Sequence, residues 1–172
     1  MTRVAMLGCG FVANMYRASF PAHPELALVG VHDRLQARAA AMAASTGAAA
    51  YPSFEALLED ETVDLVLNLT NPAEHFATTK ALLESGKHVY TEKPLAMTLP
   101  EAQELVDLAE ARGLLLCSAP CTMLNRVAQT LWRAVREERA GPVRLVYAEM
   151  DDGMAPRAPT AKWVNELGAP WP

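Results

Sequence analysis

The stretch that decides the fold is residues 4–13, which read VAMLGCGFVA. A short apolar run leads into the spacing Gly8-x-Gly10-x-x-Ala13, which is typical of a turn between a strand and a helix. Gly8 permits the tight turn, Gly10 lets a diphosphate approach the backbone, and Ala13 lets the helix pack against the strand. The free N–H groups and the positive dipole end of the helix favour phosphate. The pattern therefore predicts a dinucleotide site.

A carboxylate at the end of the next apolar run supports this interpretation. Asp33 follows Ala13 by about 20 residues and can accept hydrogen bonds from the hydroxyls of an adenosine ribose. Asp33 would repel a 2′-phosphate, whereas the neighbouring Arg34 could pair with that phosphate or stack on adenine. We therefore expect NAD as the cofactor in preference to NADP.

Composition and charge exclude several classes of protein. The chain has 172 residues, of which 51% are hydrophobic, so we expect a folded globular body. A net charge of −5 gives no basic surface for nucleic acid, and no apolar run approaches the ~20 residues that span a bilayer. Without a signal-peptide pattern, we expect a cytoplasmic protein. The three cysteines (Cys9, Cys117 and Cys121) lack paired metal-ligand spacing, so we expect reduced thiols and no metal site.

Strands alternate with helices through residues 1–119. The predicted strands cover residues 4–7, 27–32, 49–51, 63–69, 87–91 and 114–118, and the predicted helices cover residues 11–20, 35–45, 53–58, 71–84 and 98–112. Several of these strands are unbroken runs of Val, Leu and Ala, which is typical of parallel strands buried on both faces. The alternation predicts right-handed crossovers and a doubly wound α/β domain over residues 1–119.

Residues 120–172 are expected to begin a second, α+β domain. A helix over residues 125–139 has apolar residues on one face, and residues 143–150 resemble a long strand. One helix and one strand cannot form a covered sheet, so we expect this domain to be incomplete. The unpaired edge of the strand would favour association with a second copy of the chain.

Polar residues after residues 63–69 would reach the edge where a parallel sheet binds ligands. Thr70-Asn71-Pro72 opens the next helix, with Asn71 at the cap position and Pro72 at the first helical position. Asn71 can act as a helix cap or contact the ribose of the nicotinamide, and both roles stay open.

Glu92-Lys93-Pro94 follows residues 87–91 at the same edge. Pro94 disfavours helical dihedral angles at Lys93, and the bond between them can be cis. Near a cofactor ring, Lys93 could orient a substrate hydroxyl or share its proton. The alternative is that Lys93 is a solvated surface charge.

Together these motifs resemble those of the Gfo/Idh/MocA oxidoreductases, a family named for glucose–fructose oxidoreductase, inositol dehydrogenase and a rhizopine-catabolism protein. The likeness covers nearly all of residues 1–150, and the Glu-Lys-Pro element is its most specific part. It implies a Rossmann domain, and hydride transfer between a nicotinamide cofactor and a sugar, cyclitol or similar polyol. It also implies that Lys93 is catalytic and that His75 lines the cofactor cleft. The residues expected to bind the cofactor are Gly8, Gly10, Phe11, Val12, Asp33, Arg34, Thr70, Asn71, Pro72, His75, Glu92 and Lys93.

One departure from the family pattern affects the expected activity. Family members are roughly twice this length, and their second domain supplies an Asp and a His that act with the lysine. Here no such pair follows residue 150, and the last histidine is His88. Hydride transfer from an alcohol needs a group that takes the hydroxyl proton, so we expect this chain alone to be weakly active or inactive. A non-catalytic module that binds or senses NAD is the alternative. Glu92–Pro94 disfavours a methyltransferase that uses S-adenosylmethionine.

Overall fold

The structure, a computed structural model, describes residues 1–120, 124–139 and 141–149. The chain divides into two compact units, Met1–Thr122 and Met123–Pro172. Within the described residues, no helix has the length and apolar character needed to cross a membrane.

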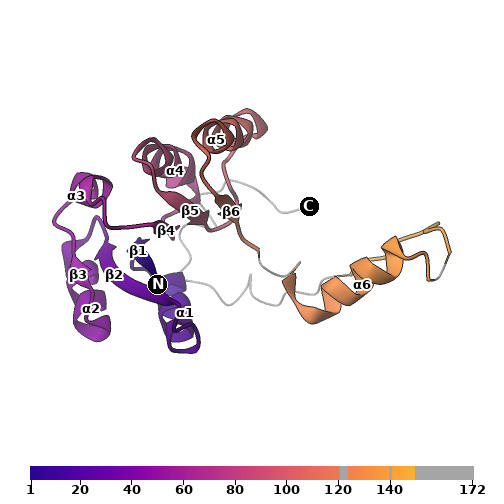
Figure 1. Ribbon diagram of the computed structural model, residues 1–172, viewed down its shortest axis with the longest axis horizontal. Helices are drawn as coiled ribbons and strands as arrows, with labels where there is room; N and C mark the ends of the chain where they lie inside the picture. Colours follow the sequence, from indigo (N-terminus) through magenta and orange to yellow (C-terminus); the bar gives the residue numbers. More distant parts are fainter. Residues whose placement is uncertain (121–123, 140, 150–172) are drawn as a thin grey trace. The chain divides into compact units, whose positions relative to one another are not determined.

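The first unit is built on one six-stranded parallel sheet in the order β3-β2-β1-β4-β5-β6 (Figure 1). The strands are β1 (Thr2–Leu7), β2 (Leu26–His32), β3 (Ala49–Ala50), β4 (Leu65–Asn68), β5 (His88–Thr91) and β6 (Leu116–Ser118). The strand order reverses between β1 and β4, and such a reversal opens a crevice beyond the carboxyl ends of the strands. The predicted doubly wound α/β fold is confirmed.

Helices cover both faces of this sheet. They are α1 (Phe11–Ser19), α2 (Gln36–Thr46), α3 (Phe54–Glu59), α4 (His75–Glu84) and α5 (Leu99–Arg112), with short 3₁₀ turns η1 (Phe20–Ala22) and η2 (Pro72–Glu74). Figure 1 shows α1 and α2 on one side of the sheet and α3, α4 and α5 on the other. The ends differ from the predicted ranges by a few residues, as is usual where helices fray.

Local signals in the sequence set the helix ends. Ser53 accepts a hydrogen bond from the backbone N–H of Ala56 at the start of α3. At the start of α5, Thr98 and Glu101 form the predicted capping box. Gly47 ends α2 with a φ of 76°, a left-handed conformation that glycine adopts without a steric penalty.

The core consists of two apolar clusters, one on each face of the sheet. Val4 and Met6 of β1 face the cluster that contains Ala13 of α1, whereas Ala5 and Leu7 face the other cluster. The unbroken apolar sequence of β1 thus serves both faces, as expected for a covered parallel strand.

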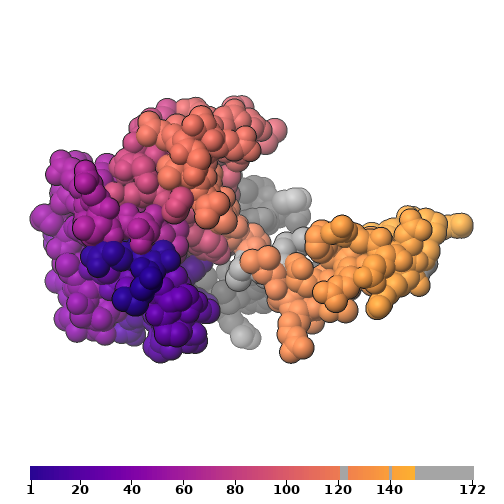
Figure 2. All heavy atoms as spheres, viewed as in Figure 1, coloured from indigo at the N-terminus to yellow at the C-terminus, as the bar shows by residue number. Residues whose placement is uncertain are grey.

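In the second unit, the described residues include helix α6 (Arg126–Arg136), which begins after Asn125. The side chain of Asn125 accepts a hydrogen bond from the N–H of Ala128 at 2.8 Å. Figure 2 shows many side chains of α6 at the surface, and its apolar Val127 and Leu131 are exposed.

The predicted strand over residues 143–150 is wrong for its described part, because residues 143–149 form no strand. Met150 lies outside the described residues. The apolar side chains of Val143, Leu145 and Tyr147 are exposed. An apolar run becomes a strand only when another strand accepts its backbone hydrogen bonds.

Candidate functional site

The glycine turn lies at the carboxyl end of β1 and against the neighbouring strands. Gly8 has a φ of 95°, and a Cβ there would lie 2.6 Å from the carbonyl oxygen of Leu69 and 3.0 Å from the N of Thr70. The backbone N–H of Gly8 donates to the carbonyl oxygen of His32 at 2.8 Å. Both the conformation and the close approach to the chain after β4 therefore require glycine.

Beyond this turn, the start of α1 is open. Gly10 is the N-cap of α1, no side chain caps the helix, and no acidic residue lies in its first turn. A Cβ at Gly10 would meet no atom within 4 Å. Phe11 is 82% exposed, and Val12 is half-buried. Uncapped N–H groups beside free space fit the diphosphate of a dinucleotide.

Asp33 holds the glycine turn against the end of β2. The side chain is 6% exposed, its Oδ2 accepts from the N–H of Cys9 at 2.8 Å, and its Oδ1 accepts from the N–H of Leu35 at 2.8 Å. Each carboxylate oxygen can accept a second hydrogen bond, so the predicted contact with a ribose stays a prediction. The sequence did not indicate this anchoring role, because it depends on how the turn folds back over β2.

The groups around Asp33 carry both signs of charge. Burial, followed by the charge of Asp33, raises the pKa of the Cys9 thiol to about 11, whereas Arg38 lowers it. Arg34 and Arg38 are both exposed, one just before α2 and the other on it. Arg38 is a basic residue near the turn that the motif analysis missed, because it does not adjoin Asp33 in the sequence.

Asn68 organises the loop that follows β4. Its side chain is fully buried, and its Nδ2 donates to the hydroxyl oxygens of Thr78 at 2.8 Å and Thr79 at 3.0 Å. Its Oδ1 accepts from the hydroxyl of Thr70 at 2.7 Å. Sequence reasoning missed Asn68, although a lone amide at the end of an apolar strand was a usable signal.

The exposed Asn71 begins the turn η2 without using its side chain as a cap. Its backbone carbonyl instead accepts from the N–H of Glu74 at 2.9 Å. Pro72, at the predicted first position, is half-buried. Of the two roles considered for Asn71, side-chain capping is absent, which leaves its amide available to a ligand.

Glu92-Lys93-Pro94 lies beyond the end of β5, and its Lys93–Pro94 bond is cis. The carboxylate of Glu92 accepts from the hydroxyl of Tyr16 at 2.8 Å through Oε1 and from the N–H of Lys93 at 3.2 Å through Oε2. Lys93 itself is exposed. The Glu92 carboxylate, predicted to contact the cofactor, is thus already bonded to two groups of the protein.

His75 differs from its predicted place on the wall of the cleft. The side chain is fully buried; its Nδ1 faces the carbonyl oxygen of Pro94, and its Nε2 faces that of Thr70 at 3.1 Å. Thr70 is half-buried. His75 therefore connects the loop after β4 to the loop after β5 from inside the protein.

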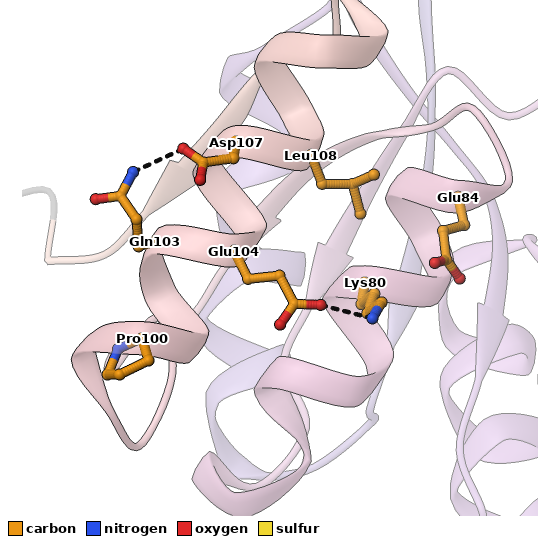
Figure 3. A pocket seen from close by; sticks show the side chains of 7 residues that line it. All are labelled: Lys80, Glu84, Pro100, Gln103, Glu104, Asp107 and Leu108. Carbon is orange, nitrogen blue, oxygen red and sulfur yellow. Dashed lines mark hydrogen bonds and ion pairs between the residues drawn. The ribbon is translucent and has the colours of Figure 1, made fainter.

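A surface hollow lies elsewhere, between α4 and α5. Figure 3 shows it lined by Lys80, Glu84, Pro100, Gln103, Glu104, Asp107 and Leu108. The ammonium of Lys80 lies 2.6 Å from a carboxylate oxygen of Glu104 across this hollow. None of the residues predicted for the site lines it. Among the described residues, no group of three or more His, Cys, Asp and Glu side chains could hold a metal ion.

Comparison with known proteins agrees with this geometry. Residues 2–119 match the model of an oxidoreductase family with an NAD-binding Rossmann fold. The chain is 33% identical to dTDP-3,4-didehydro-2,6-dideoxy-alpha-D-glucose 3-reductase of Streptomyces antibioticus, over 85% of this chain and 45% of that protein. It is 31% identical to UDP-N-acetylglucosamine 3-dehydrogenase of Acidithiobacillus ferrooxidans, over 91% of this chain and 47% of that protein. The chain thus spans about half the length of these relatives.

Two solved structures with bound cofactors are also similar. The WlbA dehydrogenase of Chromobacterium violaceum, in complex with NADH and UDP-GlcNAcA, has a TM-score of 0.75 and 30% identity, over 80% of this chain and 40% of that one. A mutant of a 3-ketoreductase from Actinomadura kijaniata, in complex with TDP-benzene and NADP, has a TM-score of 0.74 and 27% identity, over 81% of this chain and 45% of that one.

Proposed function

The chain belongs to the Gfo/Idh/MocA family of oxidoreductases, and we propose that it binds the nicotinamide cofactor of an enzyme that transfers a hydride to or from a sugar or related polyol. The observation that carries this proposal is the turn from Gly8 to Gly10. Steric crowding requires glycine at position 8, whereas the space around Gly10 is free and the helix behind it is uncapped. That space accommodates a diphosphate.

Lys93 is the proposed catalytic residue. It is exposed beyond the carboxyl end of β5, at the edge of the sheet that also carries the glycine turn. When bound, the nicotinamide would supply the position that gives or accepts the hydride. The ammonium of Lys93 would hold the reacting oxygen of the substrate and stabilise negative charge on it.

The names of the relatives support the proposed substrate class. Two of them act on sugar nucleotides, and a pig relative, 31% identical over 70% of this chain, is a trans-1,2-dihydrobenzene-1,2-diol dehydrogenase. A ring that carries a secondary alcohol or the matching ketone is common to these names. We therefore assign a cyclic sugar or polyol to the protein that contains this chain.

For the cofactor, we propose a preference for NAD over NADP. The charge of Asp33 at the end of β2 disfavours a 2′-phosphate. The nearby Arg34 and Arg38 reduce this preference, and the similar structures contain either NADH or NADP. We therefore expect only a modest difference between the affinities for NAD and NADP.

The experiment compares wild type with the Lys93→Met variant. Titration calorimetry with NADH and NADPH should show binding by both proteins, with at most a small loss in Lys93→Met, because the contacts expected at Gly8, Gly10 and Asp33 are unchanged. In the protein that contains this chain, oxidation of a panel of sugars and polyols, followed by the appearance of reduced cofactor, should fall by at least about 100-fold in Lys93→Met. Lys80→Met, which removes a half-buried lysine outside the proposed site, serves as the control. Turnover that is measurable in wild type and equal in Lys93→Met would contradict the catalytic role.

A module that binds or senses NAD without catalysis is the second candidate. It predicts cofactor binding with no turnover on any member of the panel.

A further inference from the structure

We propose that Tyr16 is a positioning residue that fixes the turn carrying Lys93 and connects this turn to helix α1. Tyr16 lies on α1, and its hydroxyl donates to the Oε1 of Glu92 at 2.8 Å. Helix α1 starts at the turn assigned to the diphosphate, so the link to cofactor binding rests on the proposed function. The role of the Tyr16 hydroxyl in holding Lys93 is independent of the proposed function.

The ring of Tyr16 is held in place by the ring of Tyr90. The two rings meet edge-on, with a centroid distance of 6.0 Å and an interplanar angle of 61°. Tyr90 lies on β5, two residues before Glu92. Such edge-on pairs are favourable beyond the simple burial of the two rings. The hydroxyl of Tyr16 is therefore presented to Glu92 from a ring that is already fixed.

The hydroxyl of Tyr16 is in its protonated form. Burial and hydrogen bonds to Tyr90 and Glu92 raise the pKa of Tyr16 well above its usual range. The hydroxyl therefore keeps its proton and acts as the donor, and the Glu92 carboxylate is the acceptor. A hydrogen bond to a charged acceptor is shorter and stronger than one between neutral groups.

The carboxylate of Glu92 also contacts the backbone of Lys93. The second carboxylate oxygen of Glu92 accepts from the backbone N–H of Lys93 at 3.2 Å. The backbone N–H of Glu92 donates to the carbonyl oxygen of Asn68 at 2.9 Å, which continues the pairing of β5 with β4. The Tyr16 hydroxyl thus orients the carboxylate, and the carboxylate in turn holds the backbone of Lys93.

The far side of the turn is held independently. The carbonyl oxygen of Pro94 contacts Nδ1 of His75, whose Nε2 faces the carbonyl oxygen of Thr70. Lys93 is therefore placed between one anchor from α1 and one anchor from α4. Removal of the Tyr16 hydroxyl should loosen the α1 side only.

The test uses Tyr16→Phe, which removes the hydroxyl and keeps the ring. Tyr51→Phe is the matched control, because the Tyr51 hydroxyl also donates to a carboxylate, Asp60, at 2.6 Å, and burial likewise raises the pKa of Tyr51. The first readout is backbone amide exchange at Lys93, measured by NMR without cofactor. We expect the Lys93 amide to exchange about fivefold faster in Tyr16→Phe than in wild type, which corresponds to the loss of one hydrogen bond. The amide of Glu92 provides the internal reference.

Faster exchange at Lys93 in Tyr16→Phe, with the amides of Glu92 and Tyr90 unchanged, would support the proposal. An unchanged rate at Lys93 would overturn it. Equal acceleration throughout β5, or the same effect in Tyr51→Phe, would also overturn it, because the role would then be general stability.

The second readout tests the connection to the cofactor. NADH should slow the exchange of the Lys93 amide in wild type, and Tyr16→Phe should lose this effect and bind NADH about threefold more weakly. Slowing by NADH of equal size in both proteins would overturn the connection. If wild type binds neither NADH nor NADPH, the proposed function fails and the connection fails with it, whereas the exchange result without cofactor still decides the positioning role of Tyr16.

Discussion

The Oδ2 atom of Asp33 accepts a hydrogen bond from the backbone N–H of Cys9 over 2.8 Å, across 24 residues of sequence. This bond joins the glycine turn to the end of the neighbouring strand. A carboxylate predicted to hold a ribose is therefore also part of the structure that shapes the proposed diphosphate site.

We expect Asp33→Asn to destabilise the first unit by about 1–3 kcal/mol, because its single amide oxygen can accept only one of the two backbone N–H bonds and that bond is no longer charge-assisted. Unfolding in urea measures this loss. Asp64→Asn is the control: the Oδ2 of Asp64 also accepts a backbone N–H bond, from Arg3 at 2.7 Å, but Asp64 is exposed. An equal loss in both variants would show that the burial of Asp33 has no special effect.

The environment of Cys9 predicts a clear difference in thiol reactivity. Cys9 is buried and its pKa is raised to about 11, whereas Cys117 is exposed. Alkylation with iodoacetamide near neutral pH, followed by peptide mass spectrometry, should modify Cys117 and leave Cys9 intact. Rapid modification of Cys9 in the folded protein would contradict the packing of the turn.

The same raised pKa has a consequence for stability. Because the folded-state pKa of Cys9 lies above the ordinary thiol value of 9.0, the stability that comes from burying its neutral thiol is fully present below pH 9. This part of the stability should decrease as the pH rises through about 11. Urea unfolding of wild type and Cys9→Ala over this pH range measures it. An unchanged difference between the two proteins would contradict the shift.

Lys87 is 2% exposed, and its ammonium donates to the carbonyl oxygens of Leu58 and Asp60, each at 3.0 Å. These carbonyls lie at the C-terminal end of α3, where a cation is favourable. Lys87→Met should lower the free energy of unfolding by about 1–3 kcal/mol, because both carbonyl oxygens lose their donor. Lys80→Met removes a half-buried lysine whose ammonium pairs with Glu104 at the surface, and it should have a smaller effect. Urea unfolding that gives equal stability for the two variants would contradict this role.

Features of the site that depend on neighbouring residues could be predicted from the sequence. The turn at Gly8 and the position of Asp33 follow from spacing that any strand–turn–helix unit imposes. The start of α5 follows from a capping box whose partners are three residues apart. In the turn and the capping box, the interacting groups are close in the chain, so the pattern of residue types is sufficient. Asp33 lies 24 residues from its partner Cys9, and its place follows from the length of the strand–helix–strand unit.

Contacts between distant segments could not be predicted in this way. The bond from Tyr16 to Glu92 joins residues 76 positions apart and depends on how α1 lies over β5. The burial of His75 depends on where the loop at Pro94 passes. For residues 143–149, the apolar pattern is compatible with a strand, but a strand also requires a hydrogen-bonding neighbour, which the pattern does not specify.

The central claim is that the space beside Gly10 receives the diphosphate of a nicotinamide dinucleotide. Gly10 has a φ of −81°, and a Cβ there would meet no atom within 4 Å, so Gly10→Val should fold, with a small loss of stability because valine is a poorer N-cap residue than glycine. Its side chain would occupy the proposed diphosphate space. Titration calorimetry with NADH should therefore give binding by wild type and at least about tenfold weaker binding by Gly10→Val. Equal affinity in the two folded proteins, or no binding of NADH or NADPH by wild type, would contradict the account.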